Sequence, residues 1–204
     1  KRRKELTVFQ NLKYADKYVG IIEQAKNLDA NFPERKYELT ETISINLFKL
    51  MIFKDEFYVS HLLTKKAFFE KIKIDYYKIN KIYFHLSPPL LSFLFKKYKK
   101  RKIKLGYWLF WFLVILSKFK FLRNTYFDPF MFTQEKKDQK VLLNNYLKFL
   151  YTLERKIDKT NYSLAVEIAS LPNMIRGYGY VRRKSIEKTN ILRDNLMEEF
   201  VKEK

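Results

Sequence analysis

Residues 134–157 read QEKKDQKVLLNNYLKFLYTLERKI, and this stretch indicates the fold class. Its apolar side chains recur every three or four residues, at Val141, Leu142, Tyr146, Phe149, Leu150 and Leu153. Such spacing places them on one face of an α-helix and leaves the charged residues on the other. We therefore expect a long helix whose apolar face packs against a core.

The same spacing recurs in other segments and predicts a mainly α-helical fold. The further helices are expected over residues 8–28, 42–64, 66–73, 105–117, 163–171 and 182–204. Thr40 is the expected N-cap of the second of these helices, because its hydroxyl can accept a hydrogen bond from the first turn. Apolar and polar residues alternate only around residues 79–86. The fold should therefore contain at most a small β element, at that place.

The segment LGYWLFWFLVILS, residues 105–117, carries no charge. It is shorter than the roughly 20 apolar residues that a transmembrane helix needs, so we expect a buried helix of the core. An alternative remains open, because two tryptophans beside the basic run KKYKKRKIK, residues 96–104, would also suit a helix lying in a membrane interface.

Composition limits the classes of function. The 204 residues suffice for one domain, and a hydrophobic content of 47% excludes disorder over most of the length. The chain has no cysteine and hence no ligands for a thiolate metal site or an iron–sulfur cluster. The opening KRRKELTVFQ has no apolar signal segment, and we expect the natural chain to extend upstream of Lys1.

The net charge of +20 has two interpretations. Dense Lys and Arg favour binding to nucleic acid or to an anionic membrane. Lys, Ile, Asn, Phe and Tyr also share A/T-rich codons, so base composition alone would give the same profile. We prefer the second interpretation, and we expect neither a nucleic-acid nor a membrane partner.

One short motif combines backbone freedom with a fixed charge. Residues 175–181 read IRGYGYV, and Gly177 and Gly179 permit a positive φ directly after Arg176. The pair does not form a nucleotide-binding fingerprint, because the third glycine and a preceding strand are missing. We therefore expect a tight turn between two helices, with Arg176 available to hold a carboxylate or carbonyl of another domain.

Other polar candidates are few. His85 lies in the extended segment and could face a cleft. Lys49, Lys54, Asp55 and Glu56 surround a helix end, where they would either orient a substrate carboxylate or form exposed ion pairs, and we favour the ion pairs. No histidine has other ligands at metal-binding spacing, so we expect no metal site and no catalytic residue in this chain.

Five segments together resemble a known family. They are RRKELTVFQNLKYADKY at 2–18, INLFKLMIFKDEFYV at 45–59, YFHLSPPLL at 83–91, LRNTYFDPFMFT at 122–133 and SLAVEIASLPNMIRGYGYV at 163–181. In this order they are similar to the C-terminal domain of the fused bacterial indolepyruvate ferredoxin oxidoreductases. Two positions depart from that pattern, because His61 replaces an expected Arg and YVRR at 180–183 replaces a His followed by Lys-Glu. These departures argue against a catalytic role for this surface.

The resemblance implies a role within a larger enzyme. Such enzymes oxidatively decarboxylate aryl pyruvates to acyl-CoA in the cytoplasm with thiamine diphosphate, and pass electrons through 4Fe-4S clusters to ferredoxin. The chain would be a single, non-catalytic C-terminal domain, residues 1–204, that contains none of these cofactors. Its partners would be the remaining domains, with a second copy of the chain as a further candidate. A basic peripheral module that binds a membrane or another anionic partner is the alternative.

Overall fold

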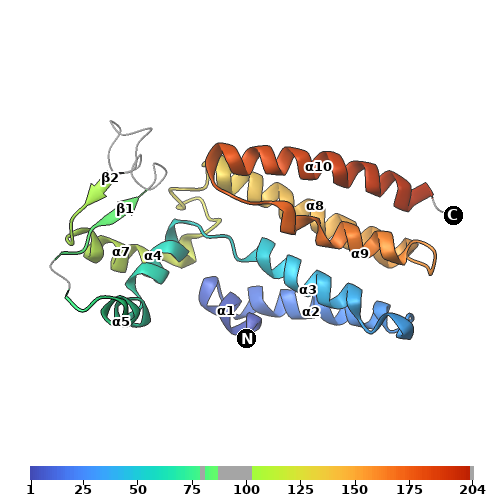
Figure 1. Ribbon diagram of the computed structural model, residues 1–204, viewed down its shortest axis with the longest axis horizontal. Helices are drawn as coiled ribbons and strands as arrows, with labels where there is room; N and C mark the ends of the chain where they lie inside the picture. The colour runs from blue at the N-terminus through green and yellow to red at the C-terminus, as the bar shows by residue number, and fades with distance from the viewer. Residues whose placement is uncertain (79–80, 87–102, 203–204) are drawn as a thin grey trace. The chain divides into compact units, whose positions relative to one another are not determined.

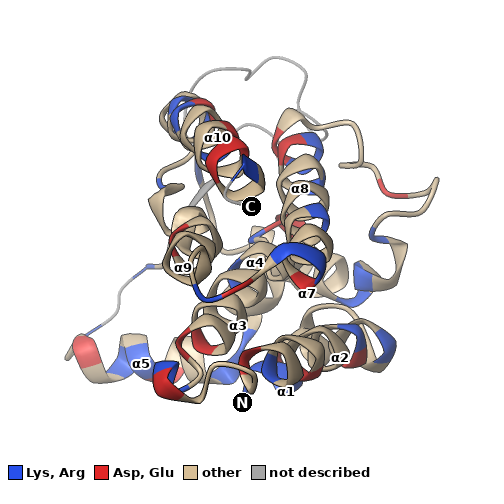
Figure 2. Ribbon diagram, turned by 90° about the vertical axis from the view of Figure 1, so that its right-hand side faces the viewer, with Lys and Arg blue, Asp and Glu red and all other residues tan. Residues whose placement is uncertain are grey.

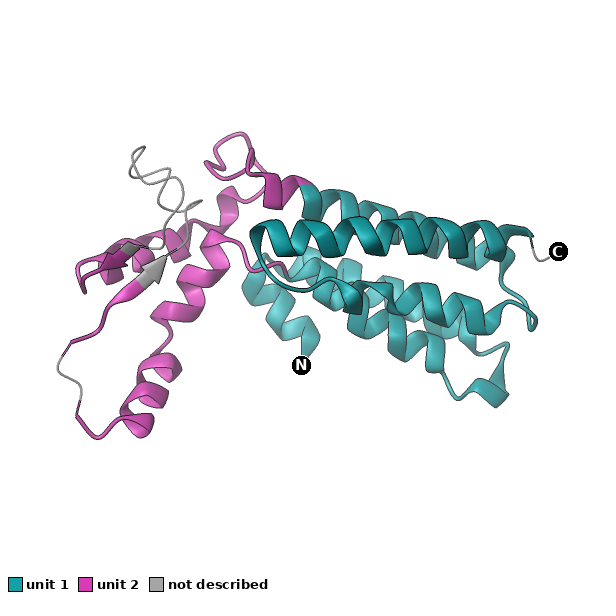
Figure 3. Ribbon diagram, turned by 45° about the horizontal axis from the view of Figure 1, so that its top comes forward, with its two compact units in different colours: residues 1–52, 138–204 teal, residues 53–137 magenta. Residues whose placement is uncertain are grey.

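The computed structural model describes residues 1–78, 81–86 and 103–202. The fold is mainly α-helical, as the sequence predicts. The chain forms two compact units (Figure 3): unit 1 comprises residues 1–52 and 138–204, and unit 2 comprises residues 53–137.

Unit 1 is a helical bundle (Figure 1). Its elements are α1 Arg2–Phe9, α2 Leu12–Asp29, η1 Pro33–Arg35, α3 Glu38–Met51, most of α8 Gln134–Lys156, α9 Tyr162–Ser170, η3 Leu171–Met174 and α10 Gly179–Lys202. The single helix expected over residues 8–28 is two helices, because the side chain of Asn11 accepts a hydrogen bond from Tyr14 N (2.9 Å) and starts α2 anew.

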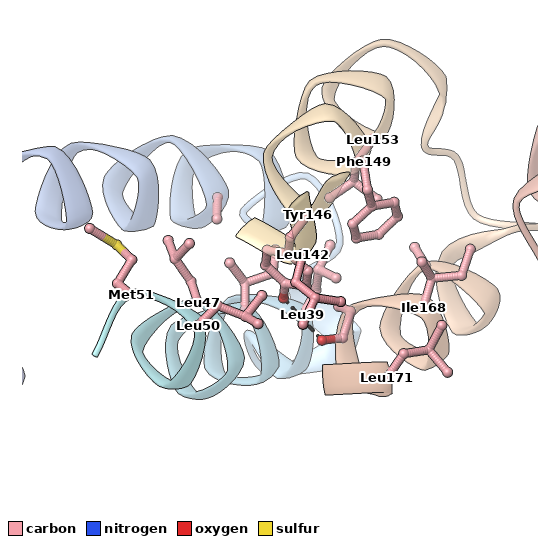
Figure 4. Packing of buried hydrophobic residues seen from close by; sticks show 14 of the residues in the cluster. Leu39, Leu47, Leu50, Met51, Leu142, Tyr146, Phe149, Leu153, Ile168 and Leu171 are labelled. Carbon is pink, nitrogen blue, oxygen red and sulfur yellow. Dashed lines mark hydrogen bonds between the residues drawn. The ribbon is translucent and has the colours of Figure 1, made fainter. Parts of the chain in front are cut away.

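The apolar face of α8 lies in the core of unit 1 (Figure 4). Its buried residues include Leu142, Tyr146, Phe149 and Leu153, and each such side chain stabilises the fold by about 1.5–3 kcal/mol relative to an exposed position. Val141 was expected on this face but is 54% exposed. The predicted helix is confirmed, but its buried face includes fewer of the expected residues, because Val141 lies outside it.

Residues distant in sequence cap the start of α3. The helix begins at Glu38, and Thr40 lies inside it, so the predicted N-cap is wrong. Thr40 donates from both its N–H and its hydroxyl to Asp29 Oδ2, each at 2.8 Å. The hydroxyl of Tyr162 accepts from Leu39 N (3.1 Å) and donates to Asp29 Oδ1 (2.7 Å). Two free N–H groups of the first turn, those of Leu39 and Thr40, are thus satisfied by α9 and α2.

Unit 2 holds the short elements. They are α4 Glu56–Thr64, α5 Lys66–Asp75, β1 Phe84–Leu86, β2 Ile103–Leu105, α7 Leu109–Lys118, η2 Phe119–Leu122 and the first turn of α8. The strands pair antiparallel, with Phe84 opposite Leu105. The expected β element around 79–86 is therefore present, although its residues 79–80 lie outside the described part of the chain. Its partner strand was not predicted.

The helix expected over residues 42–64 is also two helices. Asp55 adopts an extended backbone conformation and accepts a hydrogen bond from Tyr58 N (2.9 Å), which starts α4 after α3 has ended at Met51. α5 agrees closely with the helix expected over residues 66–73.

The uncharged helix α7 is buried on one side only. Leu109, Leu113 and Leu116 are buried in the core of unit 2. Trp108 and Trp111 are 56% and 65% exposed, so the expected core helix is present but is buried only along the side that carries these leucines. No helix in the described ranges combines the length and hydropathy required to cross a bilayer.

Candidate functional site: a basic triad beside the glycine turn

Three positively charged side chains of unit 1 lie close enough to repel one another electrostatically, where α3 ends and α10 begins. They are Lys49, Arg176 and Arg182, which we call the basic triad. Lys49 Nζ donates a hydrogen bond to Pro172 O in η3 (2.9 Å). Desolvation by partial burial, together with the positive charges of Arg176 and Arg182, lowers the pKa of Lys49. Burial and the two guanidinium charges therefore both disfavour the protonated amine.

A buried glutamine fixes the position of Arg182. Its guanidinium donates through Nη2 to Gln139 Oε1 (2.6 Å), and Gln139 Nε2 donates in turn to Leu50 O. Gln139 is only 8% exposed, and these two hydrogen bonds hold its side-chain amide in place. Arg182 is therefore held beside the last turn of α3, next to Lys49.

The glycine turn fixes the backbone at Arg176. Ser185 Oγ accepts a hydrogen bond from Arg176 N (3.2 Å) and lies within donating distance of Arg176 O (3.1 Å). Gly177 and Gly179 have φ of 84° and 54°, in the left-handed region that favours glycine. The turn predicted from IRGYGYV is thus present, between η3 and α10, and the side chain of Arg176 is exposed.

The electrostatics of the triad favour an anion. In the described part of the chain, neither Lys49 nor Arg176 forms an ion pair with a carboxylate, whereas Arg123 and Lys136, for example, pair with buried carboxylates. α10 begins at Gly179, so the positive end of its dipole lies at the same turn. Arginine guanidinium groups bind carboxylate and phosphate in two-pronged geometry. The arrangement can hold one carboxylate or phosphate group at the surface.

The neighbourhood does not enclose a small molecule. A cavity of about 30 Å³ beside the triad is lined mainly by apolar side chains, including Leu50, Tyr146 and Ile175. This volume admits about one water molecule. A ligand of the triad must therefore approach from outside, as a group on a larger partner does.

The surface of unit 1 as a whole is not basic on one side. Both signs of charge occur along α2 and along α10 (Figure 2). The triad is therefore a local feature, and not part of an extended basic face of the kind that a double-stranded nucleic acid requires.

The other predicted polar residues lie in unit 2 and do not join the triad. Lys54 is exposed. Asp55 was expected in an exposed ion pair, but it is 3% exposed and forms a two-pronged pair with Arg123, whose Nη2 lies 2.9 Å from Asp55 Oδ1. Lys136 bridges this pair to the buried Asp128, at 3.8 Å from Asp55 and 2.8 Å from Asp128. Asp55 therefore stabilises the fold of unit 2 in addition to capping α4.

Glu56 follows directly in the chain and is the most strongly perturbed carboxyl of unit 2. Burial raises the pKa of Glu56 to about 7, while Lys136 opposes that effect and the charges of Asp55 and Asp128 add to it. Its Oε2 atom is buried without a hydrogen-bond partner among the described residues. No nucleophile or histidine among the described residues is hydrogen-bonded to it, so we assign it to stability and not to chemistry.

The remaining candidates yield no second site. The backbone of His85 pairs with Lys104 in the β1–β2 ladder, and the side chain of His85 lies outside what the structure describes. No group of three His, Asp or Glu among the described residues could hold a metal ion. The chain also lacks cysteine for a cluster, so its residues do not fit a 4Fe-4S group.

Comparison with known proteins identifies the family of the chain, and the function of that family is unknown. A family model described as "Family of unknown function (DUF6537)" matches residues 1–195. The chain belongs to this family. No curated protein and no solved structure matches. The match covers every member of the triad.

Sequence reasoning identified Arg176 and both glycines but missed the role of Lys49 and missed Arg182. Lys49 was grouped with Lys54 and Asp55 because they are near in sequence, although α3 ends between them. Arg182 carries no local signal. Its role depends on Gln139, which lies 43 residues away along the chain.

Proposed function

We propose that this chain is a non-catalytic module of an indolepyruvate ferredoxin oxidoreductase, and that the basic triad holds an anionic group of the same enzyme. The observation that carries the proposal is the absence of a carboxylate partner for Lys49 and Arg176 in the described residues, beside a backbone turn that two positive-φ glycines fix. The resemblance of five ordered segments to that enzyme family supports the identity of the whole protein.

In this proposal the chemistry lies outside the chain. The remaining domains bind thiamine diphosphate and the 4Fe-4S clusters, oxidatively decarboxylate an aryl pyruvate to an acyl-CoA, and reduce ferredoxin in the cytoplasm. The chain contributes a rigid contact, and its remaining partners are ferredoxin, CoA and a second copy of the enzyme.

Among the anions of this reaction, a carboxylate on another domain fits the triad best. The cavity beside the triad is too small to enclose a substrate, and Lys49 and Arg176 are exposed while Arg182 is half-buried. The CoA phosphate and the substrate carboxylate are the competing anions. Lys54 belongs to unit 2 and is not a member of the triad.

The test uses the complete polypeptide that contains residues 1–204. We expect the purified protein to reduce ferredoxin when given indolepyruvate and CoA, and Arg176→Ala to lower turnover at least about tenfold, which corresponds to about 1.4 kcal/mol. Lys188→Ala is the control, because Lys188 is an exposed cation of α10 that is not a member of the triad.

The outcomes separate the alternatives. A complete polypeptide that does not turn over any 2-oxo acid refutes the assignment to the oxidoreductase. Activity with unchanged turnover in both variants refutes the role of the triad. A rise in the KM for CoA alone, or for indolepyruvate alone, would instead identify that compound as the anion.

A further inference from the structure

The exposed side of α7 forms an apolar face that continues into η2. Trp108, Trp111 and Ile115 follow one another at helical spacing and are 56%, 65% and 56% exposed. Phe119 and Phe121 extend the series and are 40% and 65% exposed. We call these five residues the tryptophan face. Monomeric proteins rarely leave large aromatic residues exposed together, so such a face indicates contact with a partner or a membrane.

The opposite side of α7 already packs in the core of unit 2, so the tryptophan face stays at the surface. Leu109, Leu113 and Leu116 are buried in the core of unit 2 together with Phe57 and Phe130. Both sides of α7 are thus apolar, and the core already occupies one of them. The tryptophan face is the other side.

Cations border the tryptophan face at both ends. Lys104 precedes it, and at its other end Lys118 and Lys120 alternate with Phe119 and Phe121. Residues 105–117 between them contain no charge of either sign. Long lysine side chains at the ends of an apolar segment can extend to the phosphates of a bilayer while the segment lies among the acyl chains.

The segment of sequence around the tryptophan face differs from the rest of the chain in its balance of basic and acidic residues. Residues 76–127 contain twelve Lys and Arg and no Asp or Glu, whereas all 22 acidic residues lie before or after them. Of the net charge of +20, +12 therefore belongs to these 52 residues and +8 to the other 152. Base composition explains frequent lysine throughout the chain, but it does not explain the exclusion of every acidic residue from one segment.

We propose that the tryptophan face inserts into the interface of an anionic membrane. Complementary charge selects an anionic surface as the partner. Around Trp108, Trp111 and Ile115 the stretch 105–117 is uncharged, which favours lipid over nucleic acid, because a single-stranded nucleic acid requires cations interleaved with the stacking aromatic residues. Tryptophan also prefers the boundary between headgroups and acyl chains. The inference is independent of the proposed oxidoreductase.

The chain supplies its own reporter for the test. Its only two tryptophans are Trp108 and Trp111, and both belong to the tryptophan face. The probe is a vesicle of phosphatidylcholine with about 30% phosphatidylserine, an anionic lipid of cytoplasmic leaflets. We expect the tryptophan emission to shift to the blue with these vesicles and to be quenched by brominated lipid. Pure phosphatidylcholine should give little change, and salt should weaken the binding because it screens the charge.

A matched pair of variants tests the location. Ile115→Glu places a carboxylate within the tryptophan face, and Ile191→Glu places one on α10, where Ile191 is 65% exposed. We expect Ile115→Glu to weaken vesicle binding at least about tenfold and Ile191→Glu to change it less than about twofold. Circular dichroism establishes that both variants are folded.

Three results would overturn the proposal. The first is an emission spectrum that anionic vesicles leave unchanged. The second is tryptophan quenching by a single-stranded oligonucleotide without vesicle binding, which would assign the face to nucleic acid. The third is an emission maximum already shifted to the blue in the complete polypeptide without vesicles, which would mean that another part of that protein covers the face.

Discussion

Substitution of Tyr162 by Phe tests how the fold of unit 1 is held together. The Tyr162 side chain is 1% exposed, and its hydroxyl accepts a hydrogen bond from Leu39 N while donating to Asp29 Oδ1. Burial, followed by the hydrogen bond to Asp29, raises the pKa of Tyr162 to about 12, so the hydroxyl stays protonated and keeps both roles at neutral pH.

The structure sets the magnitude of the effect. Phenylalanine keeps the ring and its packing, but it leaves the buried Leu39 N–H and one carboxylate oxygen of Asp29 without this partner. An unsatisfied buried group costs about 1–3 kcal/mol. Asp29 keeps both hydrogen bonds from Thr40, which limits the loss. We therefore expect the free energy of unfolding to fall by about 2 kcal/mol.

Urea denaturation followed by far-ultraviolet circular dichroism measures this loss. For a slope of about 2–3 kcal/mol per molar urea, the midpoint should fall by about 0.7–1 M. Tyr151→Phe is the control, because Tyr151 is 62% exposed and its hydroxyl accepts a hydrogen bond from Arg155, one turn away on the same helix. A stability within about 0.5 kcal/mol of wild type for Tyr162→Phe, or an equal loss in both variants, would refute the tertiary capping of α3.

Three further predictions concern charge and backbone. Arg123→Met should lower the free energy of unfolding by about 3–5 kcal/mol, because the buried Asp55 loses its two-pronged partner. Thermal denaturation measures this loss, and a value below about 1 kcal/mol would contradict a buried ion pair. Glu56 has a raised folded-state pKa of about 7, so folding binds a proton and wild-type stability should fall as pH rises from about 4.5 to 7. Glu56→Gln should remove this slope in urea titrations and be more stable at pH 8 by up to about 3 kcal/mol, whereas a parallel slope would contradict the burial of the charge. Gly177→Ala should lower the melting temperature more than Gly179→Ala, because a Cβ at 177 would lie 2.8 Å from another side chain and one at 179 would meet open space, and the reverse order would exclude this cause.

Local patterns in the sequence were sufficient for most helices but not for their boundaries. The helices expected over residues 8–28 and 42–64 are each divided by a new N-cap, at Asn11 and at Asp55. In both places the apolar spacing continues through the break, because the helices on each side bury residues of the same kind. Periodicity reports which residues are buried and does not report where the backbone turns.

The candidate site could be predicted only in part for the same reason. Gly177 and Gly179 indicate a turn because glycine readily adopts a positive φ, and Arg176 directly precedes Gly177 in the sequence. Lys49 and Arg182 join Arg176 only because α3, η3 and α10 come together in unit 1. Nothing near Lys49 or Arg182 in the sequence specifies that meeting.

The sequence by itself determined the helical class, the glycine turn and the absence of thiolate chemistry, because periodicity, backbone freedom and residue type are local properties. The tertiary structure decided which carboxylates are buried, which cations come together at the glycine turn and which side of α7 is exposed. These depend on what lies opposite each side chain. The sequence around Asp55 or Trp111 is the same whether the side chain is buried against a neighbour or exposed to water. Only the packing of the helices decides between burial and exposure.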